Sequence, residues 1–134
     1  MPHMIFLDHS IKNDKDLHLY TLAHELGHYF TSIGDSINST NYIQKILNNK
    51  CENKADKWAL EFLIKENELI DALNNDICSL HELAEYLDVS IEMILKRLEY
   101  LSLQKQTLKI TNNKYLVLTN LPNIYIYEDA CTYL

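Results

Sequence analysis

The sequence predicts an α+β fold that is mostly helical, with a short N-terminal strand and a C-terminal β-hairpin. Apolar residues recur at helical spacing over most of the chain between residues 15 and 101. Two β-leaning runs flank an Asn-Asn pair nearer the C-terminus. The chain has 134 residues, enough for one domain with a buried core. We therefore expect a single compact domain over 1–134, with an internal division between 1–75 and 76–134.

The first elements expected are a strand and a helix. The apolar run MIFLD at 4–8 suits one β-strand. In the helix that follows, Asp14 or Asp16 can cap the start, and the end is expected before Gly34. Apolar residues at helical offsets define a stripe that we expect to be buried. Its members are Leu19, Leu22, Ala23, Leu26 and Phe30.

Two helices are expected between residues 41 and 65. The first lies around 41–48 and ends in a turn at the sequence NNK, residues 48–50. The second runs from about Cys51 to Lys65 and has an apolar stripe at helical spacing. This stripe consists of Ala55, Trp58, Ala59, Phe62 and Leu63. A short helix near 66–73 follows.

The C-terminal half is predicted to contain a helix-turn-helix-like pair and a hairpin. Ser79 and Glu82 form an S-x-x-E capping box, which predicts a helix start. The sequence DVS ends that helix, and residues 91–101 form the next one. The β-leaning runs on either side of 112–113 predict a hairpin, and residues 123–129 could add a further strand.

Composition and charge limit the classes of function. The net charge is −7, and residues 1–75 carry 7 Lys/Arg against 11 Asp/Glu while residues 76–134 carry 5 against 8. Neither half is basic, so nucleic-acid binding is disfavoured. No apolar run approaches the roughly 20 residues of a membrane span, and the N-terminus lacks the pattern of a secretion signal, so a cytoplasmic protein is expected. Three widely spaced cysteines without C-x-x-C favour reduced thiols.

The sequence HELGH at 24–28 has the donor spacing of a metal site. Residues four apart share one helix face, so His24 and His28 can direct their imidazoles at one ion. Glu25 is rotated by about 100° from His24 and can take a proton from a metal-activated water. The alternative without a metal is an ordinary amphipathic helix that carries two histidines by chance. H-E-x-x-H arises by chance in roughly one in fifty chains of this composition.

Two patterns can supply a third ligand. The first is H-x-x-G-x-x-H continuing from His28, which requires glycine at position 31 and histidine at position 34. It is excluded because Thr31 and Gly34 stand there. A glutamate from the following helix is available in Glu52, with Asp56 one turn on to hold a ligating imidazole through its other N–H. Taken alone, Glu52 could equally be a solvated carboxylate near a helix start. Three protein ligands plus water are typical of catalytic zinc, although such donors also accept other divalent ions.

Three stretches resemble the ImmA/IrrE family of zinc metallopeptidases of phages and bacterial mobile elements. They are YTLAHELGHYF (20–30), ENKADKWALEFLI (52–64) and SLHELAEYLDVSIEMILKRLEYL (79–101). The resemblance implies a zincin-like, metal-binding core in residues 1–75. It implies one Zn²⁺ ion held by His24, His28 and Glu52, with Glu25 as the general base. It also implies an endopeptidase that cleaves a helix-turn-helix transcriptional repressor, its protein partner.

The N-terminal run is also a candidate for substrate binding. Its residues could pair with an extended substrate as an added strand. These residues are Ile5, Phe6, Leu7 and Asp8. No spacing singles out one of the nine tyrosines as a donor to the reacting carbonyl. Five other residues with possible ligand atoms are expected to bind no metal: His3, His9, His18, His81 and Cys51.

Two other functions stay open. The ELAEYLDVS sequence, the next helix and the hairpin resemble a winged helix-turn-helix, which would make the chain a DNA-binding regulator. Its candidate recognition helix offers Lys96 and Arg97, but also Glu92 and Glu99. The second alternative is a zinc-binding sensor or antitoxin-like partner, which would use the same ligands without turnover.

Overall fold

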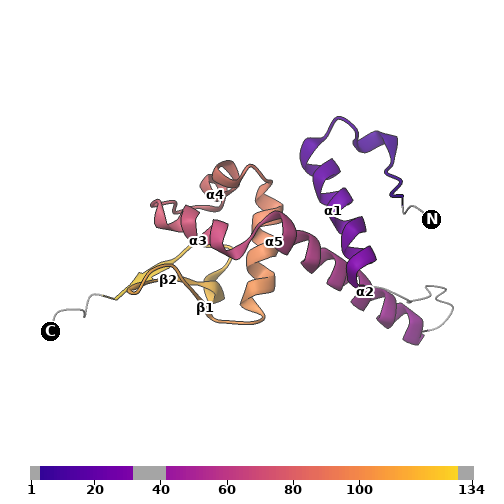
Figure 1. Ribbon diagram of the computed structural model, residues 1–134. Helices are drawn as coiled ribbons and strands as arrows, with labels where there is room; N and C mark the ends of the chain where they lie inside the picture. Colours follow the sequence, from indigo (N-terminus) through magenta and orange to yellow (C-terminus); the bar gives the residue numbers. More distant parts are fainter. Residues whose placement is uncertain (1–3, 32–41, 130–134) are drawn as a thin grey trace. The chain divides into compact units, whose positions relative to one another are not determined.

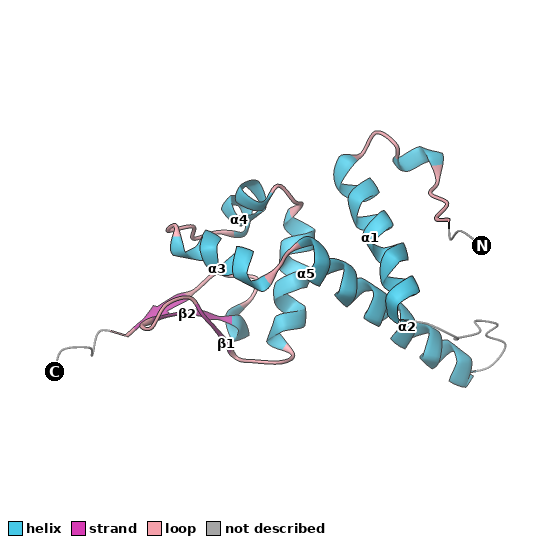
Figure 2. Ribbon diagram, viewed as in Figure 1, coloured by secondary structure: helices cyan, strands magenta, loops and turns pink. Residues whose placement is uncertain are grey.

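The computed structural model describes residues 4–31 and 42–129 (Figure 1). Contacts divide the chain into two compact units, Met1–Leu63 and Ile64–Leu134. In the described residues, the first unit contains helices and loops, whereas the strands lie in the second (Figure 2). The boundary between these units follows Leu63, so α3 (Glu66–Asn74) belongs with α4 (Leu80–Leu87), which it contacts, and the predicted division at residue 75 stays a prediction. That the two units form a single domain stays a prediction.

The first unit is built on α1 (Lys15–Thr31) and α2 (Tyr42–Leu63), which pack against each other (Figure 1). Asp14 caps α1, because its Oδ1 atom accepts a hydrogen bond from the backbone N–H of Leu17 at 3.1 Å. Of the two predicted caps, Asp14 is therefore the one used. The buried residues of α1 are small, Ala23 and Gly27.

Gly27 sets how closely the two helices approach. A Cβ atom added at Gly27 would collide with the carbonyl oxygen of Ala55 and lie 3.0 Å from its carbonyl carbon and Cα. These are backbone atoms, so no side-chain rotation relieves the contact. The glycine inside the predicted helix is thus explained by close packing of backbone on backbone.

The predicted apolar stripes of the first unit are only partly buried. Ala23 and Ala55 are buried as expected, but Phe30 and Phe62 remain 55% and 51% exposed. The reason is the short distance between the two helices. Small residues fit between them at this distance, whereas large side chains lie at the edge of the interface. Trp58 is half-buried there. Over residues 49–63 of α2, where the structure describes the side chains, the buried residues are Cys51, Ala55, Asp56, Ala59 and Leu60.

The two helices predicted between residues 41 and 65 are one continuous helix, α2. The turn predicted at 48–50 is therefore wrong. Asparagine disfavours a helix by less than about 1 kcal/mol per residue, and neither glycine nor proline interrupts the segment. Tertiary packing of the following turns on α1 outweighs so small a cost.

The strand predicted over 4–8 is not formed. Residues 4–8 belong to no helix or strand, and the described part of the first unit offers no strand to pair with them. Asp8 instead caps a 3-10 turn, η1 (His9–Ile11), where its Oδ1 atom accepts a hydrogen bond from the N–H of Ser10 at 2.8 Å. Hydrogen bonds from the backbone and side chain of Ser10 hold the pKa of Asp8 below its ordinary value of 3.8. The zincin-like core stays a prediction.

The second unit combines helices with a small antiparallel sheet, as expected. After α3 and α4 come α5 (Ile91–Ser102) and the strands β1 (Thr107–Lys109), β2 (Lys114–Val117) and β3 (Ile126–Glu128). The strand order is β1-β2-β3. Leu108 pairs with Leu116 in the register, and both are buried. The predicted short helix, helical pair, hairpin and final strand are all confirmed, within a few residues at each end.

The helix starts of the second unit follow the predicted local signals. The Oγ atom of Ser79 accepts a hydrogen bond from the N–H of Glu82 at 3.1 Å. The Oε2 atom of Glu82 in turn accepts one from the N–H of Cys78 at 3.2 Å, so the capping box is present. Asp88 ends α4 in the left-handed conformation, with φ at 55°. Ser90 then caps α5.

Candidate active site

The packing of α1 on α2 brings two histidines and a glutamate together. The Nε2 atom of His24 lies 2.9 Å from Oε2 of Glu52, and Nε2 of His28 lies 3.1 Å from Oε1 of the same carboxylate. The two imidazole rings meet edge to face, with 4.8 Å between their centroids. One donor atom from each residue lies within 4.8 Å of the others, so the group could hold a single metal ion.

The donors of this group, two imidazoles and one carboxylate, suit a divalent metal ion such as zinc. Ligands bound at about 2.0–2.1 Å and at tetrahedral angles lie roughly 3.4 Å apart. The observed nitrogen–oxygen distances are shorter by a few tenths of an ångström. The side chain of Glu52 is 57% exposed, so its carboxylate can move outward while the histidines stay in place. Two imidazoles and one carboxylate would leave a fourth position for water.

Asp56 lies on the other side of His24. Its Oδ1 atom is 3.8 Å from Nδ1 of His24, and both atoms are buried. The distance exceeds that of a hydrogen bond. The carboxylate nevertheless faces the ring nitrogen that does not face Glu52. A carboxylate on the second nitrogen fixes the orientation of a ligating imidazole in many metal sites.

Glu52 is not a helix-start carboxylate, although its exposure alone would also suit a solvated side chain. Because α2 is one helix that begins at Tyr42, Glu52 lies well inside it rather than in its first turn. The helix dipole therefore does not account for a carboxylate at this place. Glu52 and Asp56 are four residues apart and share one face of α2, next to Ala55, the residue on which Gly27 packs. The same close contact that joins the helices thus sets the two acids opposite the histidine face.

Glu25 lies outside the group of three and lines a hollow of about 630 Å³. Successive helical residues are rotated by about 100°, which places Glu25 and Tyr29 next to the histidine face and Leu26 and Phe30 beyond them. Leu26, Tyr29 and Phe30 form one wall of the hollow, and residues 4–6 form the other. The side chain of Glu25 is exposed.

Comparison with known protein families finds a match. The sequence model of the peptidase family Peptidase M78, described as the IrrE N-terminal-like domain, matches residues 2–99. The chain belongs to this family. The match includes α1, α2, α3 and α4 and most of α5, and it ends before β1. The resemblance inferred from three sequence stretches is therefore confirmed, and the histidine-glutamate group lies in a peptidase domain. No curated protein and no solved structure gives a significant match to the chain.

In this IrrE N-terminal-like domain, the predicted substrate-binding residues separate into two pairs. Ile5 and Phe6 line the hollow beside Glu25. Leu7 is not part of its lining, and Asp8 is occupied in capping η1. Residues 4–8 form no strand, so a substrate cannot add to a strand that already exists at 5–8. Whether residues 5–8 contact substrate stays a prediction.

The α1 residues that line the hollow were not predicted from the sequence. Leu26 and Phe30 were expected in a buried stripe, yet Leu26 is half-buried and Phe30 is exposed. Tyr29 is 48% exposed. The available signal was their spacing from Glu25, one, four and five residues on, which puts all of them along one side of the helix. Periodicity could not tell this side from the packed one.

The other residues with possible ligand atoms lie outside the histidine-glutamate group where the structure describes them, and that they bind no metal stays a prediction. His9, His18, His81 and Cys51 belong to no group of three His, Cys, Asp or Glu at metal-ligand spacing. His81 pairs with Glu85 at 3.0 Å on the surface. Cys51 and Cys78 form no disulfide, and Cys51 is buried. His3 lies outside the described residues.

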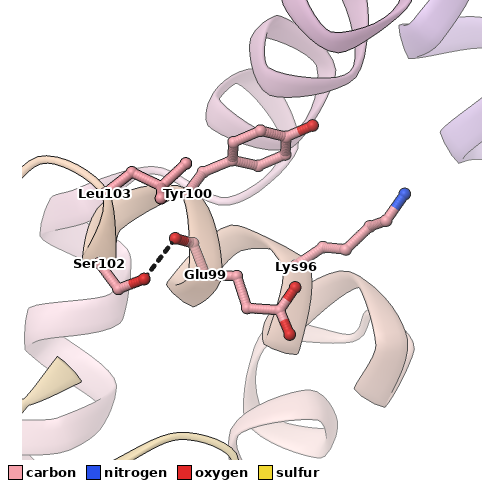
Figure 3. A pocket seen from close by; sticks show the side chains of 5 residues that line it. All are labelled: Lys96, Glu99, Tyr100, Ser102 and Leu103. Atoms are coloured by element: carbon pink, nitrogen blue, oxygen red, sulfur yellow. Dashed lines mark hydrogen bonds between the residues drawn. The ribbon is translucent and has the colours of Figure 1, made fainter. Parts of the chain in front are cut away.

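The second unit of the IrrE N-terminal-like chain has a hollow of about 350 Å³ along α5 (Figure 3). Its lining consists of Lys96, Glu99, Tyr100, Ser102 and Leu103. The hydroxyl of Ser102 donates to the backbone oxygen of Glu99 at 2.6 Å, which closes the end of the helix (Figure 3). The lining contains no histidine or cysteine, so nothing in it matches the chemistry of the first unit.

One candidate DNA-contacting residue of α5 has a structural role. Arg97 is only 5% exposed, and its Nε atom donates a hydrogen bond to the carbonyl oxygen of Ile64 at 2.7 Å. A guanidinium held in this way is not presented to a phosphate backbone.

No helix in the described part of the chain has the length and apolar character needed to cross a membrane.

Proposed function

We propose that the chain is a zinc-dependent endopeptidase. The observation that carries this proposal is the convergence of His24 and His28 on the two carboxylate oxygens of Glu52. These three residues would hold one zinc ion, and membership of a peptidase family supports a hydrolytic role for it. Other divalent ions could occupy the same donors.

Each residue of the site then has a defined task. When bound, zinc activates a water molecule and polarises the carbonyl group of the scissile peptide bond. Glu25 accepts the proton of the attacking water and returns it to the leaving amine. Asp56 restrains the ring of His24 from the Nδ1 side. The contact of Gly27 with Ala55 keeps the histidines opposite Glu52.

The substrate proposed is a helix-turn-helix transcriptional repressor. The support for it is the resemblance of three sequence stretches to the ImmA/IrrE family, together with the family match over residues 2–99. A cytoplasmic location is part of the same proposal, because a DNA-bound repressor is found there. Cleavage of the repressor would release the genes that it controls.

The decisive experiment mixes the zinc-loaded protein with a candidate helix-turn-helix repressor from the same organism, with and without a chelator. We expect discrete repressor fragments that disappear when zinc is removed. Glu25→Gln should keep its zinc, measured by atomic absorption, but cleave about 10²–10⁴-fold more slowly because the proton acceptor is lost. Normal cleavage by Glu25→Gln would show that the general base is wrongly assigned. Zinc-dependent binding of uncut repressor would instead favour the sensor.

A further inference from the structure

We propose that the hollow beside Glu25 receives a large apolar side chain of the substrate, next to the scissile bond. Cleavage would then be selective for such a residue. This inference rests on the proposed peptidase function and adds the class of residue that the site selects.

The position of Glu25 links the hollow to the reaction. By helical geometry, its side chain lies between the face that carries His24 and His28 and the face that carries Leu26 and Phe30. Its own atoms form part of the lining. Consecutive Cα atoms of a peptide are about 3.8 Å apart, so a peptide bond within reach of Glu25 places a neighbouring side chain over the hollow.

The lining determines which side chains fit. Glu25 is the one charged residue in the lining, and the other members are aliphatic or aromatic. A substrate carboxylate would be repelled by Glu25, and a substrate amide would lose water among mostly apolar side chains, with the hydroxyl of Tyr29 as its neutral polar neighbour. The volume of about 630 Å³ admits the largest side chains, and a large apolar side chain covers more of the apolar lining than glycine or alanine does. Leucine, methionine and phenylalanine meet both conditions.

Aromatic stacking holds one wall in place. The ring of Phe30 stacks on Trp58 with 5.1 Å between centroids, and Trp58 stacks on Phe62 at the same distance. Tyr29 meets Phe30 edge-on at 5.0 Å. These contacts restrict the rotamers of Phe30 before any substrate arrives. A pre-ordered apolar wall binds a side chain at a lower entropic cost.

Residues 4–6 complete the hollow from the opposite side. Met4 and Phe6 are 72% and 85% exposed, so their apolar surface is open to a partner. The capped turn η1 begins directly after Asp8 and anchors the segment. Their contribution is through side chains and does not require the segment to be a strand.

A binding experiment tests the inference without turnover. Trp58 is the single tryptophan of the chain and stacks on Phe30, so its fluorescence should report occupation of the hollow. The full-length protein is titrated with N-acetyl-phenylalanine amide, N-acetyl-glycine amide and N-acetyl-aspartate amide. We expect saturable binding of the phenylalanine probe that is about tenfold or more tighter than binding of the other two.

Variants then locate the binding site. Ile5→Ala and Phe6→Ala should each reduce the preference for the phenylalanine probe several-fold. Phe62→Ala is the matched control, because Phe62 is half-exposed and belongs to the same aromatic stack but not to the lining. Equal affinity for the three probes, or a preference that survives both lining variants, would overturn the inference.

Cleavage of internally quenched octapeptides that differ only at the central residue provides the second measurement. We expect kcat/KM to be about tenfold or more higher with phenylalanine or leucine than with glycine or aspartate at that position. Peptide cleavage without such a preference would refute the hollow as a specificity site. Undiminished cleavage by Glu25→Gln would refute the proposed mechanism alone, because the probe titration measures the hollow independently of turnover.

Discussion

His24 is the residue on which most of the candidate site converges. Its Nε2 atom faces Glu52 and its Nδ1 atom faces Asp56, so two of the acids of α2 act on one imidazole. His28 adds a second Nε2 atom to the same carboxylate. Both histidine side chains are about four-fifths buried, whereas that of Glu52 is 57% exposed. The imidazoles thus form the fixed part of the site, and Glu52 is the ligand able to adjust.

Replacement of Asp56 tests whether the second nitrogen of His24 matters. Asp56→Asn keeps the shape of the side chain but removes the negative charge that faces Nδ1. We expect zinc affinity to fall by about 10–100-fold, the usual effect of losing a carboxylate behind a ligating histidine. Competition with a chromophoric chelator measures this change.

A second acid on α2 provides the control. Glu61 is exposed and pairs with Lys57 at 3.8 Å, one turn along the same helix. Glu61→Gln changes the charge by the same amount and should leave zinc affinity unaltered. If Asp56→Asn also binds zinc like the parent protein, Asp56 has no part in holding His24.

At the scale of the elements, each of three faces of α1 has a different role. Ala23 and Gly27 pack on α2, the next face carries the two histidines, and the remaining side lines the hollow with Glu25 at its edge. The packing face governs the other two, because the distance between the helices decides whether the histidines reach Glu52. That distance depends on the missing side chain at Gly27.

Gly27→Ala should therefore destabilise the protein and weaken zinc binding. Alanine favours a helix by about 1 kcal/mol over glycine, but an extra methyl group in a packed contact typically costs about 1–3 kcal/mol. Here the methyl group meets the backbone of Ala55, so the helices must separate. We expect a lower Tm by calorimetry and a lower zinc affinity in the same sample.

Leu17→Ala is a suitable comparison for this variant. Leu17 is 45% exposed on the same helix, and its truncation should change Tm and zinc affinity little. A Gly27→Ala protein as stable as the parent, with unchanged zinc affinity, would mean that the close contact is not required.

For the molecule as a whole, metal binding and folding should be linked. The proposed ligands come from α1 and α2, so an ion that binds them stabilises only the folded arrangement. Zinc at 100 times its Kd would add about 2.7 kcal/mol to the free energy of unfolding. We expect Tm to rise with zinc and to fall again with chelator.

Two histidines of α1 separate a specific effect from a general one. His28→Ala should abolish most of the zinc-dependent rise in Tm. His18→Ala, at an exposed position of the same helix, should retain it. An equal rise in both variants would place the ion elsewhere.

Charge over the whole chain also bears on the rival function. The net charge is −7, and Arg97 is buried on the carbonyl oxygen of Ile64. We therefore expect no DNA binding at low salt in a fluorescence anisotropy titration. Affinity that falls steeply as salt rises would revive the winged-helix regulator.

The sequence alone determined the donor residues, the family and most of the local structure. Motif spacing and capping residues act over three or four positions, so Asp14, Ser79 and the turn at 112–113 were predictable from neighbours in the chain. The histidine pair was predictable for the same reason, since one helix carries both.

The tertiary structure alone decided what these residues meet. Whether Glu52 reaches the histidines, which stripe of α1 is buried, and whether residues 4–8 find a strand all depend on segments far apart in the chain. The sequence marks apolar residues but not their partners. Here the close contact of Gly27 with Ala55 has room only for small residues in the interface, so Tyr29 and Phe30 lie outside it and line the hollow. Burial depends on the distance between neighbouring elements, which periodicity does not contain.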